Sequence, residues 1–431
     1  LVAFVFLLLP PTIMGAVFPI AARLATPGIG VLGASLGRLY AANTVGAVAG
    51  SLFGGFVLLE ALGAQWGIVA ICAINAALGL FLLLWAQKGS VFRLLGAVGG
   101  VPLLLVGAAV AMRVQPTVVY GPAFRERPAR LLYCREGSEA SLAVIQGPFA
   151  ERELNVNGES TAFANFSDLT VHKMLGHLPL ALAAGARDVL VVGFGLGSTA
   201  AAVACHPVHS IDCVELVPYE TETARFFEDE NRGVLRDRRF RLIVGDGRNY
   251  LAVTQKKYDV ISMNAVHPAL SPNLYTREFY LLCRRRLRQP GVLCVWLPTN
   301  TRHFRMLART LQSVFPETTL WFCNPAHTLL IAGRRVLDLD FRAISRVLSQ
   351  RRVAADLAQV GLEDPARFVN GMLLDTRCLK RLSGVGPLHT DDHPFAEFEF
   401  PERTEMLSVV RQILQARPRM PWKVSRVPHG K

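Results

Sequence analysis

Charged residues are almost absent from the first quarter of this 431-residue chain. Residues 1–115 carry only six, which are Arg23, Arg38, Glu60, Lys88, Arg93 and Arg113. Soluble domains carry charge on about a quarter of their residues, so this scarcity excludes an ordinary soluble domain there. The rest of the chain has a normal density of charge. The sequence therefore divides into an apolar part and a soluble part.

Several motifs that would define a chemistry are also missing. The eight cysteines are scattered, with no CxxC pair and no histidine cluster at metal-ligand spacing. We therefore expect no metal, and free thiols in a reducing compartment. No lysine follows the glycine-rich turn described below, which disfavours a nucleoside triphosphate. A GxSxG nucleophile elbow is likewise absent from the sequence.

Long uncharged stretches make up the apolar part. Each has about 19 residues or more, and a membrane-spanning helix needs about 20. They are residues 1–22, 39–59, 61–87 and 94–112. We predict a membrane domain over residues 1–115 with about four transmembrane helices, the first kinked or broken at its prolines. Because the chain starts inside an apolar run without Met, we expect that earlier helices are missing from this sequence.

The soluble part divides into four segments by its pattern. Residues 116–170 contain short alternating runs between Gly-rich turns, which predict a small β-hairpin domain. Residues 171–335 alternate strands with helices and predict a Rossmann-like domain. Residues 336–410 are mixed and mostly helical in pattern. Residues 411–431 are basic and proline-rich, which predicts a disordered tail.

The alternation in the third segment predicts a parallel sheet covered on both faces. We expect a helix over residues 171–182. Strands are then expected near 188–193, 210–215, 240–245, 258–263 and 292–297, with helices near 198–205, 218–229, 274–288 and 302–314. Two further runs, 318–323 and 327–332, predict a closing antiparallel hairpin. The fold class is thus an α-helical membrane segment followed by an α/β domain.

The stretch from Asp188 to Ser198, DVLVVGFGLGS, predicts a strand, a tight turn and a helix. Gly193, Gly195 and Gly197 allow positive φ and let a ligand approach the backbone. Such a turn at the carboxyl edge of a parallel sheet is typical of nucleotide-binding folds. A purely structural turn would use glycine too, so the neighbouring residues must decide.

Polar residues follow the next strands at the same edge. Glu215 ends the second strand, 18 residues after Gly197, where nucleotide folds place an acid on ribose. Asp246 and Gly247 follow the third strand, although an aspartate there could be only a helix cap. Asn264 and His267 follow the fourth. Together these residues predict a nucleoside site, and its carboxylates would attract a cationic sulfonium.

The motifs around this site carry a resemblance. VVGFGLG, VELVPYE, VGDGRNYL, KYDVISMN, NLYTREFY and PGVLCVWLP resemble the spermidine synthase (polyamine aminopropyltransferase) family. The apolar runs PPTIMGAVFPIAARL and GRLYAANTVGAVAGSLFGGFVLL resemble its membrane-fused branch. The resemblance implies a methyltransferase-like Rossmann fold preceded by a small hairpin domain. It also implies decarboxylated S-adenosylmethionine as co-substrate and a small-molecule amine as acceptor.

Several positions depart from the family pattern. The family has a D-x-x-D-P stretch after the fourth strand, and this chain has Asn264 and His267 at its two acidic positions. An asparagine cannot accept a proton near neutral pH, whereas a histidine can. Leu196 replaces the aspartate of the glycine-rich turn. Thr161 replaces a glutamine, and Val171 and Lys173 flank His172 where the family has Y-H-E. The positions for the nucleoside are kept, and those for amino groups are largely lost.

Three functional hypotheses follow. The first is a spermidine synthase-like aminopropyltransferase of polyamine biosynthesis, with an altered acceptor or reduced activity. Its catalytic candidates are Asn264, His267 and His172, and its nucleoside-binding candidates are Gly193, Gly195, Gly197, Glu215, Asp246 and Gly247. The second is an S-adenosylmethionine-dependent methyltransferase with another acceptor. The third is a membrane-anchored ligand-binding protein without catalysis.

Charge and cofactor bear on location and partners. The net charge of +13 favours contact with phospholipid headgroups of a lipid bilayer. The basic run at Arg284–Arg286 and Arg288 is more typical of a solvated helix face than of a nucleic-acid site. Basic residues around the first and third loops would place the soluble part outside, and those after residue 112 favour the opposite. We expect an integral inner or plasma membrane protein with a cytoplasmic soluble part, where adenosyl cofactors occur. The sequence leaves a homo-oligomer open.

Overall fold

The computed structural model describes residues 2–26, 28–85, 129–264, 267–334, 340–398 and 403–417. The chain forms two compact units, each described here by itself. One comprises Leu1–Pro116 with Arg135–Ser138, and the other comprises Thr117–Cys134 with Glu139–Lys431. The predicted membrane stretch 94–112 lies outside the described residues. So does the end of the predicted tail.

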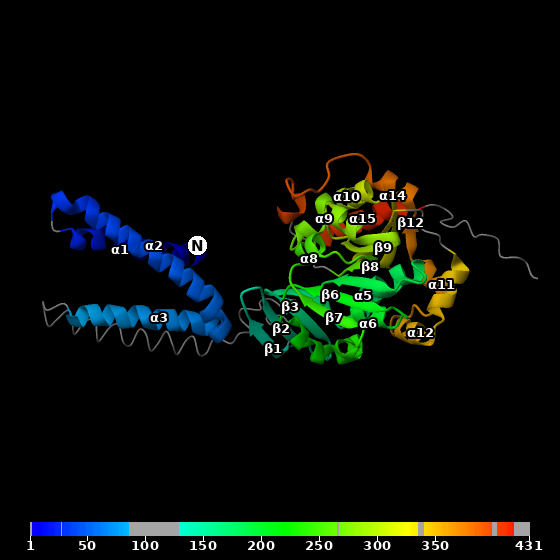
Figure 1. Ribbon diagram of the computed structural model, residues 1–431, viewed down its shortest axis with the longest axis horizontal. Coiled ribbons are helices and arrows are strands. Elements are labelled where there is room, and N and C mark those ends of the chain that lie inside the picture. Colours follow the sequence, from blue (N-terminus) through cyan, green and yellow to red (C-terminus); the bar gives the residue numbers. More distant parts are fainter. Residues whose placement is uncertain are drawn as a thin grey trace, which may run out of the picture. The chain divides into compact units, whose positions relative to one another are not determined.

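The described residues of the first unit between 2 and 85 form apolar helices (Figure 1). Helix α1 is Val2–Ala25, and it shows no break at its prolines. Helix α2, Leu32–Phe53, continues through a π-helical turn, Gly54–Leu58, into α3, Leu59–Trp85. By length and composition, Leu32–Gly79 is the one helical stretch among the described residues that could cross a membrane. Gly63 interrupts this helical stretch, because its φ of 71° and ψ of 173° are not helical. The interruption lies close to Glu60, where the sequence predicts that one membrane span ends and the next begins.

The second unit begins with a small antiparallel sheet. Its strands are β1 Arg130–Glu136, β2 Ser141–Gln146, β3 Arg152–Val156 and β4 Glu159–Phe163, in the order β1-β2-β3-β4. The sequence predicts two or three strands between residues 131 and 158. The additional strand, β4, lies beyond that window, and only one of its five residues is buried, so its apolar alternation is weak.

An eight-stranded mixed sheet forms the centre of the second unit. Its strands are β5 Asp188–Val192, β6 Ser210–Glu215, β7 Phe240–Val244, β8 Tyr258–Met263, β9 Leu287–Pro298, β10 Glu317–Asn324, β11 His327–Gly333 and β12 Met372–Leu374. Their order is β12-β10-β11-β9-β8-β5-β6-β7. Strands β5 to β9 are parallel, and β11 runs antiparallel to both β9 and β10. This is the predicted methyltransferase-like Rossmann fold with a closing antiparallel hairpin. Strand order reverses between β5 and β8, and ligands of such sheets bind at that switch point.

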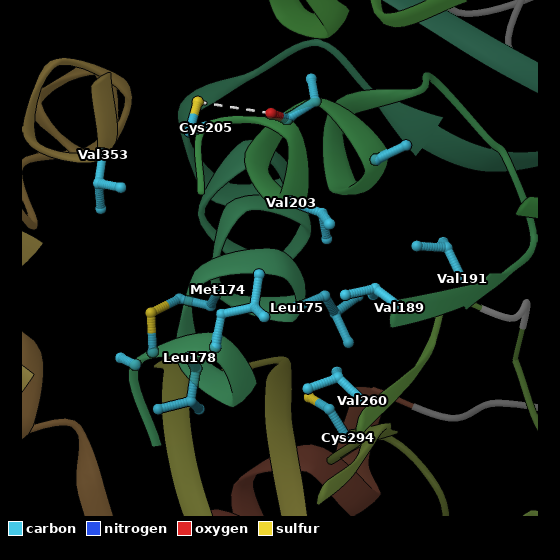
Figure 2. Packing of buried hydrophobic residues seen from close by; sticks show 14 of the residues in the cluster. Met174, Leu175, Leu178, Val189, Val191, Val203, Cys205, Val260, Cys294 and Val353 are labelled. Atoms are coloured by element: carbon cyan, nitrogen blue, oxygen red, sulfur yellow. Dashed lines mark hydrogen bonds between the residues drawn. The ribbon is translucent and has the colours of Figure 1, made fainter. Parts of the chain in front are cut away.

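Helices cover both faces of this sheet (Figure 1). One layer contains α5 Phe166–Leu182, α6 Ser198–Ala204, α11 Phe341–Leu348 and α12 Arg351–Leu357. The other contains α8 Gly247–Val253, α9 Arg277–Arg286, α10 Phe304–Val314, α14 Thr376–Ser383 and α15 Arg403–Ala416. Alternate residues of β5 enter the two cores: Val189 and Val191 pack under α5, and Leu190 and Val192 pack on the opposite face. Figure 2 shows Met174, Leu175 and Leu178 of α5 against Val189, Val260 and Cys294.

Two local predictions differ from the structure, and the segment predicted as mixed contributes one short strand. The expected helix over 218–229 is a 3-10 helix, η5 (Glu220–Phe227), followed by the short α7, Glu228–Asn231. Thr223 donates its hydroxyl to the Glu220 carbonyl, and such local bonds compete with an α-helix. The mixed segment after residue 336 adds strand β12, which pairs with β10. Helix α15 extends to Ala416, so the first residues of the predicted tail are helical.

The C-terminal extension is attached to α5 by a buried charged cluster. Asp356 of α12 is fully buried, and its carboxylate lies 2.9 Å from Lys173 Nζ and 2.9 Å from His177 Nε2. Arg232 Nη1 lies 2.9 Å from the same carboxylate, and His206 Nε2 lies 2.9 Å from His177 Nδ1. A carboxylate only accepts hydrogen bonds, so His177 donates to Asp356 and accepts from His206. A buried carboxylate in this fold is therefore matched by two cations.

Candidate functional site

The glycine-rich turn follows β5 directly at the switch point. Gly193, Gly195 and Gly197 have φ of 88°, 57° and 81°, in the left-handed region that favours glycine. A Cβ on Gly195 would lie 3.2 Å from Asn264 Nδ2, so the turn passes close under the residue that follows β8. The structure thus brings together the glycine-rich turn and one of the predicted catalytic positions.

Glu215 ends β6 and folds back onto this turn. Its Oε2 accepts a hydrogen bond from the Phe194 amide at 2.7 Å, and its Oε1 accepts one from the Val217 amide at 2.8 Å. Only 6% of the residue is exposed. Each carboxylate oxygen can accept more than one hydrogen bond, so these contacts leave acceptor capacity for ribose hydroxyls.

A second carboxylate, absent from the sequence prediction, lies beside Glu215. Glu220 Oε1 accepts a hydrogen bond from the Gly195 amide at 2.6 Å, and the residue is 6% exposed. Burial and the neighbouring Glu215 charge raise the pKa of Glu220 well above its usual range. The motif VELVPYE ends with Glu220, so the sequence does contain a signal for this residue. The α-helix predicted over 218–229 gives no reason to expect the Glu220 side chain at the turn.

Asp246 and Gly247 follow β7 and begin α8. Asp246 Oδ1 accepts a hydrogen bond from the Asn249 amide at 2.7 Å, so this residue does cap the helix. A Cβ on Gly247 would lie 2.6 Å from Val192 Cγ1, which accounts for this glycine by close packing of α8 on β5. Asp246 is partly exposed at the same sheet edge as the glycine-rich turn.

His172 and Asn264 form a hydrogen-bonded pair over the turn. His172 Nδ1 lies 3.0 Å from Asn264 Oδ1. The Asn264 amide nitrogen lies 3.5 Å from the carbonyls of Gly193 and Phe194, so its oxygen faces His172 and the imidazole donates. Burial is the largest influence on the pKa of His172 and lowers it. His172 is therefore neutral near pH 7, with Nε2 as its basic nitrogen.

His267 has the opposite tautomer. Its Nδ1 accepts a hydrogen bond from the Ala269 amide at 3.1 Å, so a neutral ring carries its proton on Nε2. The ring packs edge-on against Trp296, with 6.4 Å between centroids. In this arrangement His267 offers a donor, and His172 offers a base. Residues 265 and 266, between Asn264 and His267, lie outside the described residues.

Three further side chains at this edge were missed by the sequence prediction. Trp296 of β9 donates its indole N–H to His327 Nδ1 at 3.1 Å. His327 of β11 lies with Nε2 3.6 Å from Asp168 Oδ1 on α5. The carboxyl end of β9 meets the start of β11 because these strands are antiparallel, with His327 paired to Pro298. The sequence alone does not predict this strand register, and so it does not predict that these side chains meet.

The other side chains that depart from the family pattern are engaged elsewhere in the fold. Leu196 is fully buried in a cluster with Val144, Leu154, Ala162 and Phe227. Val171 lies in the core under the sheet, and Lys173 binds Asp356. The Thr161 hydroxyl donates to the Leu154 carbonyl at 3.0 Å.

The basic run at the end of α9 and the start of β9 serves internal contacts. Arg286 Nε donates to the Leu251 carbonyl at 3.0 Å. Arg288 forms ion pairs with Asp188 at 2.7 Å and with Asp259 at 2.9 Å. The predicted solvated face is therefore wrong for these two residues, which hold neighbouring elements together.

Comparisons with known proteins address the same region. Residues 168–328 match the family model described as the spermine/spermidine synthase domain. This part of the chain is thus similar to a spermine/spermidine synthase domain. The match begins at Asp168 and ends one residue after His327, so this domain contains the glycine-rich turn and the residues around it.

Curated proteins similar to this region are polyamine aminopropyltransferases. The protein from Pseudomonas syringae pv. tomato is 29% identical over 183 residues, which cover 42% of this chain and 63% of the relative. The one from Sodalis glossinidius is 30% identical over 166 residues, 38% of this chain and 57% of the relative. This chain thus spans less than two thirds of the length of either relative. Spermidine synthase from Thermotoga maritima has a similar structure, with a TM-score of 0.46 and 19% identity over 66% of this chain and 88% of the other.

Proposed function

We propose that this protein is an aminopropyltransferase of polyamine biosynthesis, which transfers the aminopropyl group of decarboxylated S-adenosylmethionine to a small amine. The observation that carries the proposal is the His172–Asn264 pair over the glycine-rich turn, because it sets a neutral base at the switch point of a synthase domain. The similarity to polyamine aminopropyltransferases supports the same activity.

The donor would occupy the edge formed by the turn, Glu215 and Asp246. Glu215 would accept the ribose hydroxyls, and Asp246 would face the adenine. The glycines would let the donor approach the backbone, with Gly247 holding α8 close to β5. The donor carries a cationic sulfonium. Carboxylates at this edge would attract that charge strongly, because water is partly excluded there.

The acceptor would lie against Asp168 and Trp296, next to His172 and His267. An amine arrives protonated at neutral pH, so the site must bind a cation and then remove a proton. Asp168 supplies a carboxylate, and an indole face attracts ammonium groups. His172 would take the proton on Nε2, with Asn264 fixing its tautomer, and His267 would orient the acceptor as a hydrogen-bond donor.

A transfer assay on the full chain in detergent tests this proposal. Radiolabelled aminopropyl product is expected with putrescine, spermidine or cadaverine. His172→Ala is expected to lower kcat by about 100-fold or more, because a positioned base contributes about 10²–10⁴ in rate. His267→Ala is the matched control and should act mainly on KM. Transfer by neither wild type nor variant to any of the three amines would reject the activity, and a larger kcat loss in His267→Ala would reject the assignment of the base.

A methyltransferase is the second candidate. The observation that favours it is the absence of carboxylates at Leu196 and Asn264, because an acceptor other than a diamine would not need them. Supplying S-adenosylmethionine in the same assay separates the two, since methyl transfer in preference to aminopropyl transfer would favour this candidate. A chain that binds both donors and transfers neither group would be the non-catalytic ligand-binding protein.

We also propose that the apolar helices anchor the protein in the inner or plasma membrane, with the synthase domain in the cytoplasm and basic residues near anionic lipid. The apolar stretch Leu32–Gly79 supports this anchoring. The expected result is that the expressed protein stays in the membrane fraction after alkaline carbonate washing and is released by detergent. Release by carbonate alone would contradict an integral anchor.

A further inference from the structure

The loop that follows α14 has an apolar side chain at its tip. Val385 is completely exposed and lies between Gly384 and Gly386. Gly384 has a φ of 63°, in the left-handed region that favours glycine, so the chain turns sharply before the valine. A single exposed valine is common on protein surfaces. The residues around this tip decide whether it has a partner.

Two arginines of α10 hold the loop. Arg305 Nε donates to the Leu382 carbonyl at 2.7 Å, and Arg309 Nη2 donates to the Pro387 carbonyl at 2.8 Å. These bonds use neutral carbonyls, so both positive charges remain at the base of the loop. Burial and the neighbouring Arg305 charge lower the pKa of Arg309. The loop therefore has an apolar tip and a base that carries two cations.

Helix α14 adds three exposed basic side chains. Arg377, Lys380 and Arg381 line a hollow of about 620 Å³. Residues three and four positions apart share one face of a helix, so these like charges repel each other. Lys380 and Arg381 lie in the last turn, where the helix dipole favours cations, but Arg377 lies in the first turn, where the dipole favours anions. The dipole of α14 therefore does not account for Arg377.

Carboxylates do not neutralise these charges. Among the described residues, none of the five basic side chains of α10 and α14 forms an ion pair with a carboxylate. Both helices lack acidic residues, and Asp375, the N-cap of α14, accepts a hydrogen bond from the Cys378 amide at 2.7 Å. Several arginines elsewhere in the same unit are paired with Asp or Glu, namely Arg232, Arg236, Arg239, Arg241, Arg248 and Arg288. The charges of α10 and α14 are thus open to an anionic partner.

Helix α15 packs against α14 in the same layer as α10 (Figure 1). Leu407 and Leu414 of α15 are 67% and 56% exposed, and they lie seven residues apart, so they share one face. The exposed Arg411 lies between them on that face. Residues 417–431, which follow the helix, contain five basic residues and no acidic one. Exposed leucines beside arginines are typical of helices that lie in a membrane interface.

We propose that the exposed side of α14, the loop 384–386 and α15, here called the α14–α15 face, binds the surface of an anionic phospholipid bilayer. Arg377, Lys380 and Arg381 contact lipid phosphates, and Val385 enters the boundary between headgroups and acyl chains. This contact is additional to the proposed transfer reaction and rests on the proposed membrane location. Single-stranded nucleic acid is another polyanion, but its sites stack bases on aromatic rings. The exposed apolar side chains of the α14–α15 face are aliphatic, which favours lipid.

Chemical acetylation of the full chain in lipid nanodiscs tests the proposal. One set of nanodiscs contains phosphatidylcholine alone, and the other contains one third phosphatidylglycerol. Acetic anhydride modifies accessible lysines, and mass spectrometry measures the rate at each. The rate at Lys380 is expected to be at least about fivefold lower with phosphatidylglycerol, because each basic residue near an anionic surface strengthens binding about fivefold. The exposed Lys257, directly before β8, is the internal control and should react equally in both.

Arg377→Gln combined with Arg381→Gln keeps Lys380 as the reporter and should remove most of its protection. Arg342→Gln combined with Arg346→Gln is the matched control, because these exposed arginines have the same spacing on α11, in the other helix layer. It should leave the protection unchanged. Equal rates at wild-type Lys380 in the two lipids would overturn the proposal, and so would protection that survives in the α14 double variant. Protection of Lys380 in detergent by a single-stranded oligonucleotide would assign the face to nucleic acid instead.

The lipid contact and the integral anchor can fail separately. If alkaline carbonate releases the chain, vesicles of the two compositions are added to the free protein and acetylation is measured again. Protection of Lys380 by anionic vesicles alone would then support the α14–α15 face while the anchor is rejected. Equal rates with both vesicles would overturn the lipid contact as well. The comparison of the two lipids in wild type decides the matter even if a variant fails to fold.

Discussion

Glu215→Ala is expected to weaken binding of decarboxylated S-adenosylmethionine, S-adenosylmethionine and methylthioadenosine alike, by at least about 100-fold. Two buried amides, of Phe194 and Val217, lose their acceptor, and the ribose common to all three ligands loses its carboxylate. Leaving buried donors unpaired costs about 1–3 kcal/mol each, so loss of the turn geometry adds to loss of the direct contact. Isothermal titration with the three ligands measures the effect.

A loss shared by all three ligands would identify the ribose as the group that Glu215 contacts, because the ribose is common to them. Glu228→Gln is a suitable control, since Glu228 is exposed and pairs with Arg236 at the surface. Glu215→Gln keeps the size of the side chain and tests whether charge or shape matters. Unchanged affinity in Glu215→Ala would remove Glu215 from the nucleoside site.

Asp356→Ala is expected to lower the free energy of unfolding of the second unit by about 3–5 kcal/mol, the usual effect of breaking a buried ion pair from one side. Lys173 and His177 are fully buried and would lose their acceptor, and Arg232 would lose its partner. Urea unfolding followed by tryptophan fluorescence measures the change. A loss below about 1 kcal/mol would show that the cluster is not a stabilising one.

The double variant Lys173→Met with Asp356→Leu is the informative comparison, because apolar replacement of both partners often restores stability. The pH dependence adds a second check. Burial lowers the pKa of His177, and it lowers the pKa of His206 to about 3. The unfolded chain binds protons below about pH 6.5 that the folded cluster excludes, so stability should fall as pH drops from there toward 3. The pKa of Asp356 is also lowered, and its contribution is lost only as pH falls below about 4.

Local pattern was enough to predict the sheet and the turn. Strands β5, β6 and β8 are short apolar runs ended by glycine or a polar residue, and their bounds agree with the prediction to within one residue. The same rule located Glu215, Asp246 and Asn264, because every parallel strand delivers its last residue to one edge. The alternation of side chains along a strand and the point where the strand ends depend on a few neighbouring residues. Both can therefore be predicted without knowledge of the fold.

The residues that were missed depend on long-range contacts. Trp296 and His327 meet through an antiparallel register between strands some 30 residues apart, and Asp356 reaches His177 across 179 positions. Glu220 required a 3-10 helix whose first residue turns inward, and a helical pattern cannot predict that. The sequence likewise gave no reason to send Lys173 into the core while His172, its neighbour on α5, faces the turn.

The adjacency of His172 and Lys173 has a consequence for where this domain ends. The family model matches residues 168–328, but the carboxylate that neutralises Lys173 comes from position 356. A chain cut at the end of the match would bury an ammonium group with its counter-ion removed, one residue from the proposed base. The region that folds together is therefore longer than the matched residues 168–328. The C-terminal extension is needed to stabilise the helix that carries His172.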